Sequence, residues 1–549
     1  MKRDSSNLIL NYVRMHAGTF ITTCLVGFIA SFFNVLLPLS VGKFFELLYQ
    51  EQSTKGKLLE MLSLPINDMQ SFFIFFFSLI ALRGVFGFFQ NYLTAYTGER
   101  FIADLRVELF KAQLTMNLRH FEKRHLSRHL QKYTGDMRFI QKWMTKGVIG
   151  GPIDIFFLLF AFVALYQINA EVTLGLIASM FSAGIIMMVI SRIIGKSTER
   201  RNNERGRLLE FVAQRLQGIL SVKFFNREIV EVDRFKKNND DFVATGKKTF
   251  VRQAFLESML PIMFFLIIVV VMWLSVKFNG SNSPSNSLTF MLVLLYLQGA
   301  FRRILRLPAI WSQAKVSFDS LDRQLLKSRE RRANKEALND TYGLIKFNGV
   351  TLESGNQILV SNFSTLVHPN TVVFFQIENP EVRNSLLRVL GGTEKPAEGE
   401  IKIDNDSLAD FNPFQIRKSL AYVSESLPLI GSTVFEAVSF YTTDEKRDKA
   451  NKILTSLRFQ EHYSGDRLAI LLEGDQPKLN AGDALKLSFA RAILTSKKTI
   501  ILDNPFDGID EATIISICEV LNKLKQKRTI IMMAPSCPGV LHFDKKVVV

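Results

Sequence analysis

The sequence has 549 residues, of which 48% are hydrophobic and 48 are phenylalanine, so it is too long for one ordinary core and too apolar for a typical soluble protein. Its formal net charge of +17 lies wholly within residues 1–330, because residues 331–549 carry 27 basic and 27 acidic side chains. A basic excess that coincides with apolar segments indicates cytoplasmic loops near anionic lipid and argues against nucleic acid as a partner. Cys24, Cys518 and Cys537 are too scattered for a disulfide framework or a metal site.

Six apolar segments, each close to the roughly 20 residues that a membrane-spanning helix needs, stand out in the first part of the chain. They occupy residues 18–41, 71–93, 148–168, 171–194, 254–276 and 287–310. The basic stretch from Met1 to Arg14 is not followed by a small-residue cleavage site. We therefore interpret the first segment as an uncleaved membrane helix rather than a signal peptide. Residues 1–326 are expected to form an all-α domain with six membrane-spanning helices.

The connections between segments two and three, and between segments four and five, are long and basic. The stretch from Arg100 to Lys146 alone contains eleven Lys and Arg residues. The positive-inside rule places these connections, both termini and any soluble domain in the cytoplasm, as expected for an integral protein of the cytoplasmic (inner) membrane. The amphipathic pattern of the connections predicts that the helices continue beyond the bilayer. No carboxylate pattern accompanies His120, His125 and His129, so we expect solvated surface histidines and no metal site.

Four arginines lie inside the predicted spans. Arg83 is in the second segment, and Arg302, Arg303 and Arg306 are in the sixth. A charge at membrane depth is costly and usually faces a cavity or a partner. One interpretation is a basic, inward-facing cavity that receives an anionic lipid head group or an acidic peptide. The other is that these side chains reach out to the inner head groups of the bilayer.

Residues 327–342 are charged and almost free of large apolar side chains, which predicts a solvated linker. Residues 343–549 alternate strand-like and helical segments and therefore predict an α/β domain. The strand candidates are residues 345–352, 372–375, 401–404, 420–423 and 499–503. The second candidate is followed by a loop and by an apolar helix predicted to begin near Asn384. This order of strand, loop and helix is the context of the glycine-rich loop that binds phosphates.

The loop from Ile377 to Ser385 lacks what phosphate binding needs. It contains no glycine, so its backbone N–H groups cannot easily converge on an anion, and Pro380 has no N–H to donate. Glu378 and Glu381 add negative charge where a polyphosphate would lie, and the single cation of Arg383 does not offset them. Taken alone, this stretch is equally compatible with an ordinary strand–turn–helix unit.

The six spans, the two long cytoplasmic excursions and the C-terminal domain together resemble one subunit of an ABC exporter of the six-helix type. Residues 116–136 and 217–228 resemble the segments around the two coupling helices of that family. Gly399–Asp404, Ala490–Ala492 and Asp507–Asp510 match its nucleotide-binding domain in order and spacing. The resemblance covers nearly the whole chain. It implies a multi-domain membrane protein whose helical domain is followed by an α/β, ABC-ATPase-like domain at residues 343–549.

The chemical positions of the family are mostly substituted. The resemblance leaves a vestigial nucleotide site at Arg383, Asn384, Ser385, Asp503 and Gly482. The catalytic positions carry Asn504 for the glutamate that polarises water, Glu425 for the glutamine that senses magnesium, and Pro535 for the histidine. An amide such as that of Asn504 cannot act as a general base. The signature segment reads Leu479–Asp483, and Asp483 would repel a phosphate. Ser354 stands where an adenine-stacking aromatic residue is expected.

Asp503 and Asp510 have a structural alternative as capping or turn residues. We therefore expect an ABC exporter-like half-transporter that acts as a homodimer or heterodimer, with no catalytic residues and no bound ATP or magnesium. Its transport would be independent of ATP or driven by a partner subunit. Two other functions remain open, a non-transporting membrane scaffold and an ATP-binding transporter with a non-standard site. An active subunit encoded beside this one would favour the heterodimer, and nucleotide-dependent thermal stabilisation would favour the last.

Overall fold

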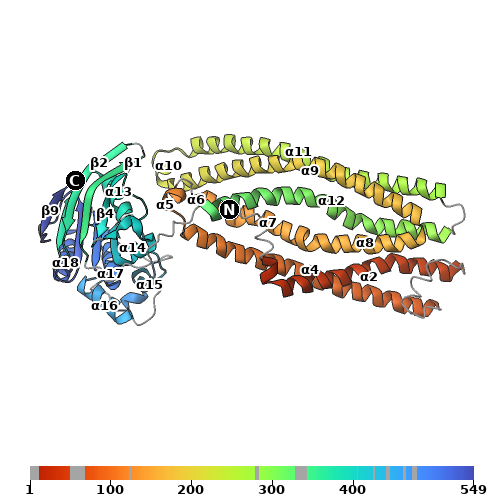
Figure 1. The fold of residues 1–549 in the computed structure, drawn as a ribbon, viewed down its shortest axis with the longest axis horizontal. Coiled ribbons are helices and arrows are strands. Elements are labelled where there is room, and N and C mark those ends of the chain that lie inside the picture. The colour runs from red at the N-terminus through yellow and green to blue at the C-terminus, as the bar shows by residue number, and fades with distance from the viewer. Residues whose placement is uncertain are drawn as a thin grey trace. The chain divides into compact units, whose positions relative to one another are not determined.

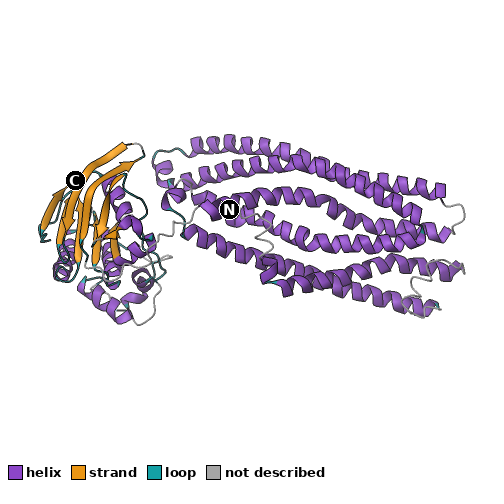
Figure 2. Cartoon of the chain, viewed as in Figure 1, coloured by secondary structure: helices purple, strands orange, loops and turns teal. Residues whose placement is uncertain are grey.

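A computed structural model of the chain describes residues 12–49, 68–122, 126–278, 284–327, 343–355, 357–404, 406–424, 427–440, 446–460, 465–472 and 479–549. The chain divides into two compact units, of which the first comprises Met1–Met116 and His120–Arg329 and the second Asn117–Arg119 and Glu330–Val549. Most of the predicted linker, residues 328–342, lies outside the described residues. Long helices build the first unit, and the strands belong to the second (Figure 1, Figure 2).

The helices before the linker are mostly long. They are α2 (Ala17–Tyr49), α4 (Met69–Leu114), α5 (Leu118–Glu122), α6 (Leu126–Gln131), α7 (Met137–Trp143), α8 (Gly150–Ile168), α9 (Ala170–Gln217), α10 (Ile219–Phe224), α11 (Glu228–Phe278) and α12 (Pro284–Lys327). Two π-helical turns, η1 (Lys132–Asp136) and η2 (Met144–Ile149), join α6, α7 and α8 into one helical run. The 46 residues of α4 span about 70 Å, more than twice the roughly 30 Å of a hydrocarbon core. The helices thus continue beyond a bilayer, as predicted.

Five helices in the described part of the chain are long and apolar enough to cross a membrane. They are Ala17–Val41, Met69–Leu114, Leu126–Ile168, Ala170–Val189 and Glu228–Lys277. The sixth predicted span, residues 287–310, is helical within α12 but is not among these five. Polar residues from Ser285 to Ser287 precede its apolar core, and Arg302, Arg303 and Arg306 follow it. Its crossing of the membrane stays a prediction.

Two buried clusters hold α12 in place among its neighbours. The larger cluster joins α12 to α8, α9 and α11 through side chains such as Leu297, Leu165 and Leu176. The other joins it to α4, α7 and η2 through side chains such as Phe318 and Ile140. Figure 1 also shows α2 beside α4 and α9 beside α11, and these pairs are in contact. Packing on both sides fixes which face of α12 points to the interior.

The second unit contains two sheets. Its strands are β1 (Ile345–Ser354), β2 (Gln357–Val367), β3 (Val372–Gln376), β4 (Glu398–Ile403), β5 (Asp406–Ser407), β6 (Leu420–Ser424), β7 (Thr499–Asp503), β8 (Thr529–Ala534) and β9 (Lys545–Val548). Its helices are α13 (Pro380–Leu390), η3 (Leu408–Asp410), α14 (Pro413–Ser419), α15 (Val434–Ser439), α16 (Arg447–Ser456), η5 (Arg467–Ala469), α17 (Ala481–Leu494) and α18 (Glu511–Leu524). One sheet is parallel, with strand order β6-β7-β8-β3-β9, and the other is antiparallel, with order β2-β1-β4-β5.

The parallel sheet positions the residues of the predicted nucleotide site. Every residue of β7 and β8 is buried, as is typical of central strands covered on both faces. Strands β3, β6 and β7 end at Gln376, Ser424 and Asp503, so their carboxyl ends lie at one edge, where open α/β sheets place ligands. All five predicted strands are present. Strand β8 was not among the predicted strands, although its apolar run resembles that of β7.

The helix after β3 begins earlier than the sequence led us to expect. We predicted a start near Asn384, whereas α13 begins at Pro380. The reason is local: the Asn379 side chain caps the helix by accepting a hydrogen bond from the Glu381 N–H at 2.9 Å, and proline suits the first helical position. Only Ile377 to Asn379 are left as a connection, so a nine-residue loop does not exist.

Gly399 of β4 is needed for close approach of two strands. Its φ is +77°, and a Cβ there would lie 2.2 Å from the Gly349 carbonyl oxygen, which is backbone and cannot move aside. We expect Gly399→Ala to destabilise the α/β unit by at least about 1 to 3 kcal/mol, measured as a loss of protection from hydrogen exchange in β1 and β4. Gly508→Ala is the matched control, because Gly508 has a φ of +65° with open space around it. Equal losses in the two variants would contradict the clash.

Candidate functional site

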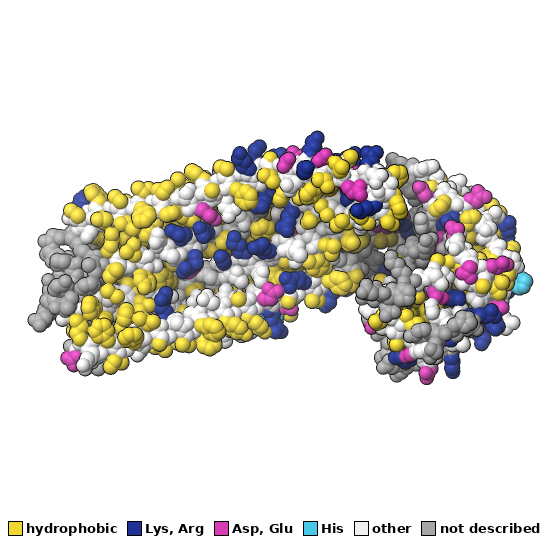
Figure 3. Space-filling view, turned by 180° about the vertical axis from the view of Figure 1, so that it is seen from behind, with side chains coloured by type: hydrophobic (Ala, Val, Ile, Leu, Met, Phe, Trp, Pro, Cys, Tyr) yellow, Lys and Arg dark blue, Asp and Glu magenta, His cyan; other side chains and the backbone are white. Residues whose placement is uncertain are grey.

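A cavity of about 710 Å³ lies inside the helical unit. Its walls come from α2, α4, α7, η2, α8, α11 and α12. Figure 3 shows basic side chains gathered around a hollow partway along this unit, with hydrophobic surface on both sides. Five lining residues are basic, namely Arg83, Lys142, Lys146, Arg303 and Arg306, and two are acidic, Asp154 and Glu257. With formal charges the wall therefore carries a net charge of +3.

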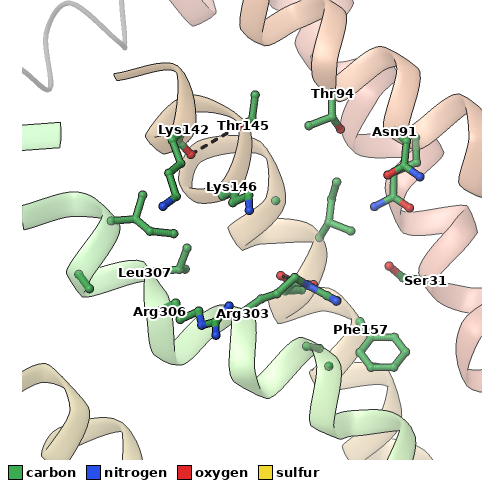
Figure 4. Close-up of a pocket in the computed structure, with 18 of the residues that line it drawn as sticks. Ser31, Asn91, Thr94, Lys142, Thr145, Lys146, Phe157, Arg303, Arg306 and Leu307 are labelled. Atoms are coloured by element: carbon green, nitrogen blue, oxygen red, sulfur yellow. Dashed lines mark hydrogen bonds and ion pairs between the residues drawn. The ribbon is translucent and has the colours of Figure 1, made fainter. Parts of the chain in front are cut away.

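Helical spacing brings the basic side chains together. Lys142 and Lys146 are four residues apart on the run from α7 into η2, and Arg303 and Arg306 are three apart on α12, so each pair lies on one helix face. In Figure 4 these four side chains approach a common space from two helices, with Thr94 of α4 across from them. The π-helical turn η2 lies at this place, and such turns often mark functional sites.

A buried carboxylate holds one of the arginines. Asp154 of α8 is 6% exposed, and the Arg303 side chain reaches it from α12. Arg303 Nε donates to both carboxylate oxygens at 2.9 Å, and Nη2 donates to Oδ1 at 2.6 Å. Two nitrogens of one guanidinium thus bind one carboxylate, which fixes the plane of the guanidinium as well as its position.

The structure places the four predicted arginines in two groups. Arg83, Arg303 and Arg306 line the cavity, whereas Arg302 does not and is only half-buried elsewhere on α12. Helical rotation alone does not explain this, because Arg302 is four residues from Arg306 and only about 40° from it around the helix axis. Arg83 also donates from Nε to Asn34 Oδ1 at 2.6 Å, which ties α4 to α2. Lys142 and Lys146 were not among the residues predicted for the site. Their four-residue spacing, which places both on one helix face, could have indicated them.

A second, more open hollow of about 610 Å³ adjoins the cavity. The two share the lining residues Ala95, Lys142, Thr145 and Lys146. The second hollow is also lined by Tyr92 and Tyr96 of α4, whose rings stack with centroids 6.2 Å apart. Glu99 and Arg138 line it as well, so the second hollow combines an aromatic wall with charged side chains.

In the α/β unit, Arg383 turns towards its own chain. Its guanidinium is buried and donates from Nη1 to the carbonyl oxygens of Ile377 and Glu378 at 3.0 and 3.2 Å. Its Nε forms an ion pair with Asp503 Oδ1 at 3.4 Å, and Asp503 Oδ2 accepts a hydrogen bond from the Ser424 hydroxyl at 2.8 Å. One buried ion pair thus links the carboxyl ends of β3, β6 and β7.

Among the described residues, the other predicted nucleotide-binding and catalytic residues form no hydrogen bond or ion pair with Arg383 or Asp503. Ser385 is buried in α13, and Asn384 is exposed beside it. Asn504, at a φ of +41°, donates from its side chain to Asp507 Oδ2 at 3.2 Å. Pro535 is exposed after β8. Glu425 lies outside the described residues.

The signature segment is capped by its own side chains. Asn480 Oδ1 accepts a hydrogen bond from the Asp483 N–H at 2.6 Å, and the Asp483 carboxylate accepts one from Gln460 Nε2 at 2.6 Å. A Cβ added to Gly482 would lie 2.9 Å from Thr513 Oγ1, so this glycine is needed for packing. Asp510 caps α18, and the Thr513 N–H that it binds holds its pKa below the ordinary value.

No cluster of three or more His, Cys, Asp or Glu residues that could hold a metal ion is found among the described residues. The expectation of solvated histidines is wrong for His129, which is 2% exposed. Its ring stacks on that of Phe121 with centroids 4.5 Å apart. His120 is exposed, and His125 lies outside the described residues.

Comparisons with known proteins agree with this architecture. A family model described as the ABC transporter transmembrane region matches residues 20–301, more than half of the chain, and one described as ABC transporter matches residues 378–507. The ATP-dependent lipid A-core flippases of Haemophilus influenzae (strain 86-028NP) and Pasteurella multocida (strain Pm70) are each 22% identical over 483 residues, covering 86% of this chain and 82% of the relative.

Among solved structures, a bacterial Atm1-family ABC exporter with ATP bound superposes with a TM-score of 0.83. It covers 98% of this chain and 93% of its own, at 17% identity, and so shows the shared fold. The chain therefore belongs to the ABC transporter family, and joins an ABC transmembrane region to an α/β nucleotide-binding domain as a half-transporter with the exporter fold.

Proposed function

We propose that this half-transporter works as a dimer in the cytoplasmic (inner) membrane and moves an amphipathic anion with a phosphate-bearing head group. We further propose that its nucleotide-binding domain neither binds nor hydrolyses ATP in the usual manner of the family. Transport would then be independent of ATP or driven by an active partner subunit. The basic cavity is the observation that supports an anionic substrate. The buried Arg383–Asp503 ion pair is the observation that supports the loss of ATP binding and hydrolysis.

The charge of the cavity supports an anionic substrate. Two opposite unit charges 4 Å apart attract by about 1 kcal/mol in water and by about 4 kcal/mol at an effective dielectric constant of 20. A wall with a net charge of +3 therefore favours a phosphate strongly over a zwitterion. Side chains that served only to reach lipid head groups would not need a buried counter-ion such as Asp154. Its contact with Arg303 supports the cavity interpretation over snorkelling.

The neighbouring hollow supports a lipid rather than an acidic peptide. An amphiphile could place its head group among the basic residues and its apolar part along Tyr92 and Tyr96. The relatives reported above are named ATP-dependent lipid A-core flippases, and a lipid substrate is in keeping with that name. The basic connections on one side of the membrane support cytoplasmic termini and uptake of the substrate from that side.

ATP and magnesium do not fit the residues at the sheet edge. A phosphate-binding loop points backbone N–H groups at the anion. Here the carbonyl oxygens of Ile377 and Glu378 point at the Arg383 guanidinium, so the polarity of the loop is reversed. Asp503, which the family resemblance assigns to magnesium, is already paired with that guanidinium. The N-terminus of α17 is likewise satisfied by Asn480 and carries Asp483.

Reversal of two cavity charges tests the substrate. The double variant Arg83→Glu/Arg303→Glu changes the net wall charge from +3 to −1. We expect it to weaken binding of phosphatidic acid to the full-length protein in phosphatidylcholine nanodiscs by at least about tenfold, which corresponds to roughly 1.4 kcal/mol. Arg302→Glu is the control for the substitution on α12, because it reverses one charge on the same helix outside the cavity lining and should leave binding unchanged.

Two kinds of result would contradict the proposed substrate site. Undiminished binding in the double variant, or an equal loss in Arg302→Glu, would exclude the cavity as the head-group site. Equal binding of phosphatidic acid and phosphatidylcholine by the wild-type protein would exclude an anionic lipid as the substrate.

A further inference from the structure

We infer that Asp154 determines the charge selectivity of the cavity by holding Arg303 as a partly neutralised, fixed ligand for the head group. The inference rests on the anionic substrate proposed above. Asp154 is an acidic residue at a basic site, and its carboxylate binds two nitrogens of the Arg303 guanidinium. From this position the Asp154 carboxylate offsets part of the positive charge of Arg303, which lowers the affinity of the cavity for an anion.

The geometry leaves one edge of the guanidinium for a ligand. Nε and Nη2 of Arg303 are taken by Asp154, whereas no hydrogen bond from Nη1 to the described part of the chain is found. The Arg303 side chain is 61% exposed and belongs to the cavity wall. Gly299, one turn earlier on α12, also lines the cavity, and a Cβ there would lie 3.5 Å from Nη1. A side chain at position 299 would thus be in van der Waals contact with Nη1, and glycine leaves that side of Nη1 without this neighbour.

The buried position of Asp154 makes its charge effective. A carboxylate that is 6% exposed is screened less than an exposed one, so it repels an incoming anion more. The repulsion grows with each unit of negative charge on the ligand. A phosphomonoester carries almost two charges at pH 8, because its second pKa is about 6, and a phosphodiester carries one. Asp154 therefore reduces the advantage of the doubly charged head group over the singly charged one.

A purely structural role predicts something different. The Asp154–Arg303 pair also connects α8 to α12, and breaking a connection between helices would lower stability and weaken all ligands together. The ratio of two affinities removes that common effect. Selectivity between phosphatidic acid, a phosphomonoester, and phosphatidylglycerol, a phosphodiester, is thus the informative readout.

The test uses the full-length protein in phosphatidylcholine nanodiscs at pH 8, titrated with each of the two lipids. Asp154→Asn is expected to raise the ratio of the phosphatidylglycerol Kd to the phosphatidic acid Kd by at least about threefold, the effect of one unit charge at about 6 Å even in water. Asp154→Glu keeps the charge but displaces the guanidinium, so both Kd values should rise and their ratio should stay at the wild-type value.

Glu257→Gln is the matched control, because it removes the same charge from an exposed lining position and should shift the ratio less. An unchanged ratio in Asp154→Asn, or a shift no larger than that of Glu257→Gln, would overturn the inference. Wild-type protein that prefers neither anionic lipid over phosphatidylcholine would instead overturn the proposed substrate, so the two failures are distinguishable.

Discussion

Replacement of Asp503 by alanine is expected to destabilise the α/β domain by about 3 to 5 kcal/mol, the typical cost of leaving one partner of a buried ion pair without the other. The variant would bury the Arg383 guanidinium without its carboxylate and remove the acceptor of the Ser424 hydroxyl. Because this pair links three strand ends, the loss should appear as faster hydrogen exchange in β3, β6 and β7 of the full-length protein.

A second variant distinguishes the loss of the ion pair from the loss of side-chain packing at this position. Arg383→Leu/Asp503→Leu removes both charges, and replacement of a buried pair by apolar residues is often close to neutral. We expect this double variant to exchange more slowly than Asp503→Ala. If Asp503→Ala left protection at the wild-type level, the pair would not hold this edge of the sheet together. ATP with magnesium should not restore protection in either variant.

The parts of the fold that local pattern controls were predictable from the sequence. Apolar length identified the helices of the first unit, and the buried run of β7 from Thr499 to Asp503 was found where its residues predicted it. The sequence predicted Arg83, Arg302, Arg303 and Arg306 together as cavity residues, and the three-residue spacing of Arg303 and Arg306 is that of one helix face. The same rule does not separate Arg302 from them, because Arg302 is four residues from Arg306, so its exclusion from the cavity is seen only in the structure.

Contacts between distant segments could not be predicted. Lys142 and Lys146 belong to what the sequence shows as a basic cytoplasmic connection, and only the approach of α12 turns them into a cavity wall. Arg383 was recognised as a cation at a phosphate position, but its use of the Ile377 carbonyl depends on the early start of α13. Asp154 was overlooked although a carboxylate within an apolar segment is itself a sign of function.

Purified wild-type protein is expected to hydrolyse no ATP, and the double variant Arg383→Lys/Asn504→Glu is expected to remain inactive. The two changes restore a lysine and a general base but leave Glu378 and Glu381 beside the phosphate path. Each carboxylate at about 4 Å opposes a phosphate by about 1 kcal/mol in water and by about 4 kcal/mol at an effective dielectric constant of 20. The three-residue connection after β3 also lacks the glycines that would let its N–H groups turn inward.

At millimolar ATP and magnesium, phosphate release measures ATP hydrolysis, and the temperature of thermal unfolding measures ATP binding. A ligand at a hundred times its Kd stabilises a protein by about 2.7 kcal/mol, so an unchanged unfolding temperature would exclude all but weak binding. Asp503→Asn in the same double variant serves as the background control, because it removes the carboxylate retained for magnesium while keeping the size of the side chain, and turnover that survives it belongs to a contaminant. Turnover in the double variant that Asp503→Asn abolishes, with hydrogen exchange of the α/β domain unchanged, would show that the connection after β3 opens to admit phosphates. In that case the reversed polarity seen at Arg383 would describe a resting state of a working ATPase rather than a lost site.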